Sequence, residues 1–349
     1  MFHVLNSVRQ NFCKITGLGH TESIDSDLFR VVSQLDFIKS LPEPTQLEIT
    51  KNGQITIEEA AANWDEMISH KRTFYDGHIA DLGFFAVKRL IEQSDFTSGK
   101  PDLNNVDVII GASNTGPGYP SLADFVKEKI GVRNDSSCFD VTEACTAGSV
   151  ALMQASALIK SGQCKKVLVV CAEKATTLTP LRNWQGSNLF GDAAFCVLLE
   201  ASDNPEDESF KFFNFKSFPF DGHLEMIRKT ENGFVQDGKK VHLFIVKEIV
   251  AEIMDTIQKA GIELNNIKHL VFHQPSNKTI SSLDTYLRNK MPDLKAIFHY
   301  SKDIGNASSA CFGHLLSRKY YEGLIGKGEL VLTCTFGAGL SMGIIGLNL

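Results

Sequence analysis

"LNNVDVIIGASN" (103–114) and "LNNIKHLVFHQPSN" (264–277) resemble each other, and this repetition decides the expected fold. A helix-like run precedes each stretch, over 81–93 in the first case and 246–262 in the second. Both stretches read as a Leu-Asn-Asn turn, an apolar strand and a polar strand end. An internal repeat of this size predicts two related α/β halves that meet at a pseudo-twofold axis.

The predicted strands are near-continuous runs of Val, Ile and Leu rather than alternating patterns. "KKVLVVCAEKA" (165–175) and "GELVLTCTFGAG" (328–339) form a second, weaker pair. Strands of this composition are usually buried on both faces, in a parallel or mixed sheet that helices cover. The acidic, Pro-containing "EASDNPEDES" (200–209) predicts a connector, which gives an N-terminal half over 1–200 and a C-terminal half over 201–349.

Residues 20–70 do not fit the repeat. "SLPEPTQLEITKNGQ" (40–54) reads as a loop, because it is rich in turn-forming residues. "IEEAAANWDEMI" (57–68) reads as an amphipathic helix. We expect this region to be a capping insertion or a lid.

The composition is that of an ordinary globular protein, with 43% hydrophobic and 22% charged residues. A net charge of −6 and the absence of a strong Lys/Arg cluster argue against nucleic-acid binding. The sequence has no run of about 18 apolar residues that would cross a membrane. The first 20 residues lack the apolar core of an export signal, so a cytoplasmic location is expected. The eight cysteines form no CxxC pair and are expected to be reduced thiols rather than metal ligands.

Cys145 is the candidate nucleophile. It lies in "DVTEACTAGSVALMQASALIKSG" (140–162), which reads as a short strand ending near Val141, a turn, and a helix that stops at Ser161 and Gly162. Unpaired N–H groups at a helix N-terminus favour a thiolate, and small neighbours let a thioester carbonyl approach. The alternative is a buried cysteine that packs as a small apolar residue.

Three further features are candidates for the same site. His273 ends the strand that matches the first half, and Asn306 lies in "DIGNASSACFGHLL" (303–316), which reads as a loop opening a helix. The turn in "FGAGLSMG" (336–343) offers backbone amides that can bind an oxyanion. Each also has a structural interpretation, since a strand-end histidine, a helix N-cap and a Gly-rich hairpin are all common.

Taken together, "ACTAG", "HQP", "GNAS" and "LFGDAAFCVLLE" (189–200) resemble the thiolase-superfamily condensing enzymes of the β-ketoacyl-acyl-carrier-protein synthase III group. The resemblance covers approximately residues 80–349. It implies an α/β, thiolase-like αβαβα five-layered sandwich, usually a homodimer, with a Cys–His–Asn site where the halves meet. It also implies thioester substrates on coenzyme A or an acyl carrier protein, and no further cofactor or metal.

The resemblance assigns roles to individual residues. It makes Cys145 the acyl acceptor, and His273 and Asn306 the donors to the thioester enolate of the second substrate. The backbone N–H groups of Cys145 and Ala338 would form the oxyanion hole. Tyr119 matches an aromatic residue of the family that reaches the neighbouring subunit's acyl pocket. Lys278 matches a basic residue of the family that could meet an acidic carrier protein. The remaining substrate-contacting positions are Trp184, Ser276, Asn277 and Phe336.

Three positions depart from the family pattern. Ser276, followed by Asn277, stands where the family has an Asn that binds the pantetheine arm, and Trp184 replaces an Arg that packs on adenine. Glu143 stands where the family has a small residue, and is interpreted as a solvated structural acid or a proton-transfer group. These departures favour a specialised pathway, of dialkylresorcinol, alkylquinolone or polyketide type.

Two other functions stay open from the sequence. One is an acyltransferase or thiolase-like enzyme that works without decarboxylation, with His273 as a general base. The other is a non-catalytic partner subunit of a heteromeric synthase. Such a subunit would be expected to lose a member of the Cys–His–Asn set, and this chain retains all three.

Overall fold

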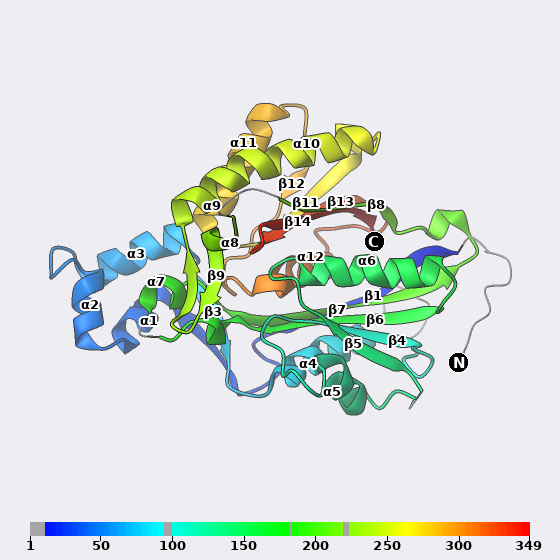
Figure 1. The fold of residues 1–349 in the computed structure, drawn as a ribbon, viewed down its shortest axis with the longest axis horizontal. Coiled ribbons are helices and arrows are strands. Elements are labelled where there is room, and N and C mark those ends of the chain that lie inside the picture. The colour runs from blue at the N-terminus through cyan, green and yellow to red at the C-terminus, as the bar shows by residue number, and fades with distance from the viewer. Residues whose placement is uncertain (1–10, 94–99, 134, 182, 219–222) are drawn as a thin grey trace.

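Two five-stranded mixed sheets, whose strands are arranged in the same order, form the centre of the protein (Figure 1). The computed structural model describes residues 11–93, 100–133, 135–181, 183–218 and 223–349. The first sheet has the order β1 (Phe12–His20), β7 (Asp192–Ser202), β6 (Lys166–Lys174), β4 (Val108–Ala112) and β5 (Ser137–Val141). The second has the order β8 (Phe210–Ser217), β14 (Ser341–Asn348), β13 (Leu330–Gly337), β11 (Ile267–Phe272) and β12 (Ile297–Phe298).

The duplication predicted from the sequence is confirmed by the pairing of these strands. β4 runs parallel to β5 and β6, while β7 is antiparallel to β6 and β1. In the second sheet, β11 runs parallel to β12 and β13, while β14 is antiparallel to β13 and β8. The two "LNN" stretches therefore lead into equivalent strands, β4 and β11, and the weaker pair supplies β6 and β13.

Helices cover and separate the sheets in five layers (Figure 1). The outer face of the first sheet packs against α4 (Ile79–Glu92) and α5 (Leu122–Ile130), with a separate apolar core between them. The layer between the sheets consists of α6 (Ala147–Lys160) and α12 (Cys311–Tyr321). The outer face of the second sheet packs against α10 (Val250–Lys259) and α11 (Asn277–Lys290). The expected αβαβα sandwich is confirmed.

The remaining elements are short. α9 (Gly238–Phe244) continues through a π-helical turn (Ile245–Ile249) into α10. The others are α7 (Trp184–Ser187), α8 (His223–Met226), the pair β9 (Ile227–Thr230) and β10 (Gly233–Gln236), and the 3₁₀ turns Ala175–Leu178, Pro205–Asp207, Leu264–Asn266 and Ser308–Ala310.

A helical insertion separates the paired strands β2 (Phe29–Ser33) and β3 (Lys71–Tyr75). It contains α1 (Gln34–Ser40), α2 (Glu43–Ile49) and α3 (Ile57–Met67), which share a small apolar core. The predicted helix over 57–68 is confirmed. The predicted loop over 40–54 is wrong where α2 forms, because its two prolines fall at the N-cap and in the first turn, where a missing N–H costs nothing.

In the part of the chain that the structure describes, no helix combines the length and apolarity needed to cross a membrane. Residues 1–10, half of the segment in which an export signal was sought, lie outside the described residues.

Candidate active site

Cys145 lies in the turn between β5 and α6, so the predicted strand, turn and helix are confirmed. The helix ends at Lys160 with Ser161 as its C-cap, and Gly162 follows with a φ of 74°, a left-handed conformation that suits glycine. The residue before the cysteine, Ala144, also has a positive φ, of 43°. The nucleophile candidate therefore stands at the start of a helix that is buried between the two sheets.

The small residues around Cys145 allow the two halves to approach closely. A Cβ atom on Gly148 would lie 2.8 Å from the carbonyl oxygen of Ser309, which belongs to the second half. A Cβ atom on Gly337 would lie 2.8 Å from the backbone nitrogen of Cys145. Contacts this short leave no room for a side chain, so these glycines bring the end of β13 and the start of α12 against the cysteine turn.

Asn306 occupies the place in the second half that Cys145 occupies in the first, just before the central helix. The loop before β7 holds its backbone: Asn306 N–H donates to the carbonyl of Leu189 (3.0 Å), and Gly191 N–H donates to the carbonyl of Asn306 (3.1 Å). The side-chain oxygen of Asn306 accepts a hydrogen bond from the N–H of Ser308 at 2.9 Å. Its amide nitrogen is thereby left to act as the donor.

His273 lies at the end of β11, and its backbone N–H donates to Cys334 at 2.8 Å. The side chain is 2% exposed, and its ring meets the ring of Phe336 edge-on at 5.4 Å. Among the described residues its buried Nδ1 has no hydrogen-bond partner. Burial lowers the pKa of His273 to about 3, and a contact with the Ser308 backbone opposes this shift only weakly. The ring is therefore neutral near pH 7.

Ser308 connects these three residues and was not predicted from the sequence. Its hydroxyl lies 3.8 Å from the sulfur of Cys145, its N–H holds the Asn306 side chain, and its backbone contacts the His273 ring. Its φ of 47° is left-handed, which is uncommon for a residue other than glycine. The structure thus brings Cys145, His273 and Asn306 together around one serine.

A buried carboxylate also borders the site. Glu173, at the end of β6, is completely buried and accepts hydrogen bonds from the side chains of Ser309, Thr115 (2.7 Å) and Asn114 (2.8 Å). The Asn114 amide nitrogen also donates to the carbonyl of Ala144 at 2.6 Å. In the sequence, Glu173 is a single acidic residue at the end of a strongly apolar strand. Nothing in that pattern marks it as part of a site.

The expected thiolate at Cys145 is not supported for the resting protein. Burial raises the pKa of the Cys145 thiol to about 12, and the negative charge of Glu173 adds to this. The hydroxyl of Ser308 acts in the opposite direction. A position at a helix N-terminus favours the thiolate, but desolvation outweighs it here, so the resting group is a thiol.

The residues that were predicted to lie at the entrance to the site form contacts with other residues of the same chain. Trp184 stacks on Trp64 of the insertion, with ring centroids 5.4 Å apart and planes at 14°. The Ser276 hydroxyl caps α11 by accepting the N–H of Thr279. The side-chain amide of Asn277 donates to the carbonyl of Asp65 at 2.8 Å. The insertion thus covers one face of Trp184 and accepts a hydrogen bond from the side chain of Asn277.

The other predicted residues lie around the site at different depths. Tyr119, in the loop between β4 and α5, is fully exposed. Ala338 forms the turn after Gly337, between β13 and β14. Lys278 lines a groove of about 530 Å³ together with Lys302. Glu143 is exposed, in agreement with its interpretation as a solvated acid.

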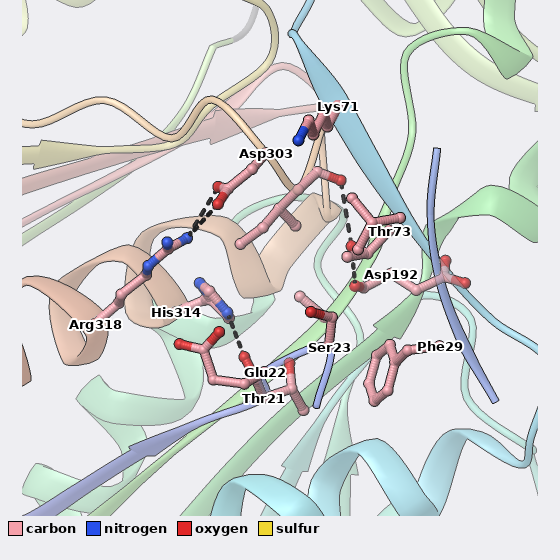
Figure 2. A pocket seen from close by; sticks show the side chains of 13 residues that line it. Thr21, Glu22, Ser23, Phe29, Lys71, Thr73, Asp192, Asp303, His314 and Arg318 are labelled. Carbon is pink, nitrogen blue, oxygen red and sulfur yellow. Dashed lines mark hydrogen bonds and ion pairs between the residues drawn. The ribbon is translucent and has the colours of Figure 1, made fainter. Parts of the chain in front are cut away.

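A separate polar cavity of about 150 Å³ is lined in part by Asp303 and Ile304, which precede Asn306 in the chain; Figure 2 shows its lining side chains. Arg318 donates to both carboxylate oxygens of Asp303 at 2.9 Å, and His314 Nε2–H donates to the carbonyl of Thr21 at 2.8 Å. Cys145, His273 and Asn306 do not line this cavity. Its ion pair instead anchors the segment three residues before Asn306.

The described residues contain no group of three or more His, Cys, Asp or Glu side chains that could hold a metal ion.

Comparison with known proteins gives the same picture over most of the chain. Residues 139–217 match the family model for 3-oxoacyl-[acyl-carrier-protein] synthase III, and residues 257–349 match the model for its C-terminal part. A β-ketoacyl-[acyl-carrier-protein] synthase III from Clostridium acetobutylicum is 30% identical over 293 residues, covering 79% of this chain and 86% of that protein. One from Sulfurimonas denitrificans is 29% identical over 302 residues, covering 80% and 88%.

The fold extends beyond the part that matches in sequence. The crystal structure of a priming β-ketosynthase from a polyketide biosynthetic pathway covers 99% of this chain, and 98% of that chain is covered, with a TM-score of 0.79 and 22% identity. At this identity the likeness concerns the fold alone. The fold, the sequence relatives and the two family models agree, and the chain belongs to the 3-oxoacyl-[acyl-carrier-protein] synthase III family of condensing enzymes.

Proposed function

We propose that Cys145 accepts an acyl group from a thioester, and that the protein then joins this group to a second thioester by Claisen-type C–C bond formation, assisted by His273 and Asn306. The observation that carries the proposal is the convergence of these three side chains on Ser308. A buried cysteine that only packed would need neither an oriented amide nor a neutral imidazole beside it.

In the first half-reaction the Cys145 sulfur attacks the thioester carbonyl. The new C–S bond replaces the old one, and the thiol proton leaves with the departing thiol. The tetrahedral oxyanion would be held by the backbone N–H groups of Cys145 and Ala338, which the close contact of Gly337 with Cys145 brings near each other. Because the proton moves from one thiol to another, this step needs no net proton acceptor.

In the second half-reaction a malonyl-type thioester loses CO₂, and its enolate attacks the acyl group on Cys145. The new C–C bond forms as the C–S bond to Cys145 breaks, and the released thiolate takes up a proton from water. The charge on the enolate oxygen appears only in this step. The Asn306 amide nitrogen is free to donate because Ser308 already holds the side-chain oxygen. His273 is neutral near pH 7 and can donate an N–H as well. Donors that act only on developing charge lower the barrier selectively.

The substrates are proposed to arrive on coenzyme A or on an acyl carrier protein. The Lys278 and Lys302 groove supports an acidic carrier, by charge complementarity. Phe336, which packs on His273, is proposed to line the substrate path, and Trp184, Ser276 and Asn277 stay proposed as substrate contacts near the insertion. A cytoplasmic location is proposed with these substrates.

The protein is proposed to work as a homodimer in which Tyr119 completes the partner's acyl pocket. In support, β5 is an edge strand of its sheet, with Phe139 partly exposed, and Tyr119 projects nearby as a fully exposed aromatic residue. Unpaired strand edges and exposed aromatic groups are typical of surfaces that bind another chain.

The pathway is proposed to be a specialised one, of polyketide, dialkylresorcinol or alkylquinolone type, rather than the first step of fatty acid biosynthesis. The support is the altered entrance, where Trp184 stacks on Trp64 and Asn277 binds the insertion. A donor that approaches this entrance meets a surface unlike the family pattern.

Intact-mass measurement after incubation with a panel of acyl-coenzyme A and acyl-carrier thioesters tests the proposal. We expect one acyl adduct, which maps to Cys145 and is lost in Cys145→Ser. Addition of malonyl thioester should then discharge the adduct with release of CO₂ and a β-keto product. Discharge without CO₂ would favour the plain acyltransferase, and the absence of any adduct across the panel would refute the proposal.

A further inference from the structure

The hydroxyl hydrogen of Ser308 has one acceptor within reach among the described residues, the sulfur of Cys145. The amide nitrogen of Asn114 lies 3.1 Å from the Ser308 oxygen, but this nitrogen carries two hydrogens and cannot accept a hydrogen bond. The Cys145 sulfur lies 3.8 Å away, a distance at which a hydroxyl can donate to sulfur. The serine proton therefore points to the nucleophile.

The orientation of Asn114 is fixed by acceptors that leave it no alternative. Its nitrogen faces the carbonyl oxygen of Ala144 at 2.6 Å and a carboxylate oxygen of Glu173 at 2.8 Å. The carbonyl oxygen of Ala144 can only accept, so the NH₂ group and not the amide oxygen must face it. Glu173 is completely buried and also accepts hydrogen bonds from the hydroxyl groups of Ser309 and Thr115, which hold its side chain in this position.

Two features show that Ser308 is placed for this contact rather than only for packing. Its φ of 47° costs on the order of 1 kcal/mol for a residue with a Cβ atom, and glycine would avoid this cost. Glycine would also keep the N–H that holds Asn306. The part of Ser308 that glycine lacks is the hydroxyl group, which contacts Cys145.

We propose that Ser308 donates a hydrogen bond to the Cys145 sulfur as the thiolate forms, and that Asn114 and Glu173 are positioning residues that direct this donor. The inference rests on the proposed function, because it assumes that Cys145 is the acyl acceptor. The donor stabilises the sulfur while the proton of Cys145 passes to the departing thiol. The acylated sulfur carries no charge, but condensation breaks the C–S bond and Cys145 leaves again as a thiolate. The hydroxyl therefore acts whenever this bond is made or broken, and it does not act in the loss of CO₂, which places charge on the enolate oxygen.

Within the described part of the chain, two titratable groups other than Glu173 lie close to Cys145. Cys311, on α12, interacts with Cys145 electrostatically, and His273 stands at the end of β11. Glu143, two residues before the nucleophile, is exposed to solvent. Of these groups Glu173 is the one whose negative charge opposes the thiolate most directly. Loss of the Ser308 hydroxyl and loss of the Glu173 charge should therefore move the titration of Cys145 in opposite directions.

The test is the rate of iodoacetamide alkylation at Cys145 at fixed pH, followed by peptide mapping. Ser308→Ala and Ser308→Gly both remove the hydroxyl, and the glycine variant suits the left-handed backbone, so at least this one should fold. For both we expect alkylation at pH 7 to be about tenfold slower. Glu173→Gln should make alkylation faster. Ser149→Ala, which removes a buried hydroxyl of α6 that bonds Thr335, is the matched control and should leave the rate unchanged.

A second readout separates positioning from general damage. Each variant is loaded with acyl groups to completion, and the release of CO₂ from the malonyl thioester is then measured, because this step places charge on the enolate oxygen and none on the sulfur. We expect Ser308→Gly to lose more of its rate in acyl transfer than in CO₂ release, because the N–H that orients Asn306 is retained. An unchanged alkylation rate in both serine variants, or equal loss in acyl transfer and in CO₂ release, would overturn the inference. If the wild-type protein takes up no acyl group at Cys145, the proposed function itself fails, which is a different result.

Discussion

The N–H of Ser308 donates to the side-chain oxygen of Asn306 at 2.9 Å, so the orientation of this amide is set by a residue two positions further along the chain. A backbone donor is retained in every substitution except one by proline. The amide nitrogen of Asn306 is therefore presented in one direction before any substrate binds, and preorganised donors of this kind are the ones that lower barriers most.

Asn306→Ala should separate the two half-reactions. We expect the acyl adduct on Cys145 to form at a nearly normal rate, and the condensed product to form about 100- to 1,000-fold more slowly. The adduct is followed by intact mass and the product by chromatography, with Cys145→Ser as the variant that loses both. If Asn306→Ala blocks the adduct as strongly as the product, the assignment of Asn306 to the enolate is wrong.

Gly305 should be essential for placing Asn306. Its φ is 83°, and a Cβ atom would lie 2.9 Å from the side chain of the fully buried Arg72. Gly305→Ala should lower the free energy of unfolding by about 1–3 kcal/mol and reduce condensation more than acyl transfer. Gly261→Ala is the matched control, because Gly261 also has a positive φ, of 64°, but nothing lies within 4 Å of its Cβ position. Equal effects of the two changes on condensation would contradict this prediction.

His273 should make the protein less stable as the pH falls. Its pKa is about 3 in the folded protein against an ordinary value of 6.5, so between these values the unfolded chain binds a proton that the folded protein does not. The contribution is absent above pH 6.5 and amounts to about 1.4 kcal/mol of lost stability at pH 5.5.

Chemical unfolding at pH 7.5 and pH 5.5 measures this contribution. His273→Gln should lose about 1.4 kcal/mol less than the wild type between the two pH values. The other buried histidines with a lowered pKa among the described residues, His20, His299 and His314, are present in both proteins and cancel in the comparison. An identical pH dependence in the two proteins would mean that His273 is not desolvated as described.

Tyr119→Ala should change which acyl chains are accepted without abolishing acylation of Cys145. The residue is fully exposed in the single chain, so a role in the acyl pocket requires a second subunit. Competition between thioesters of different length gives the chain-length profile, and sedimentation gives the oligomeric state. A monomeric protein, or a profile identical to that of the wild type, would count against the proposed dimer.

The sequence predicted the fold, and it singled out the three side chains that the structure brings together, because each leaves a local signal. The "LNN" repeats mark equivalent strands, and Cys145, His273 and Asn306 stand at strand and helix ends in recognisable motifs. Ser308 left no such signal. It is 163 positions from Cys145, and its contact depends on a left-handed backbone that a sequence of small residues does not reveal.

The protonation of Cys145 was inferred in the wrong direction for a related reason. The helix N-terminus can be read from the sequence, whereas the burial of the thiol and the nearby charge of Glu173 follow from the packing of the second half. The helix α2 was missed because two prolines were taken as loop formers, although both lie where a helix tolerates them.

The docking of Gly337 against Cys145 has a consequence for the order of events during synthesis of the protein. β13 and β14 follow the other strands of both sheets in the chain, so the surface that docks against the candidate nucleophile emerges from the ribosome after them. Until then the first half can fold around its own sheet, but the half that carries the serine, the amide and the imidazole lacks two of its five strands. An unfinished chain is therefore not expected to trap acyl groups, and the appearance of acyl-transfer activity reports that both halves have closed on each other.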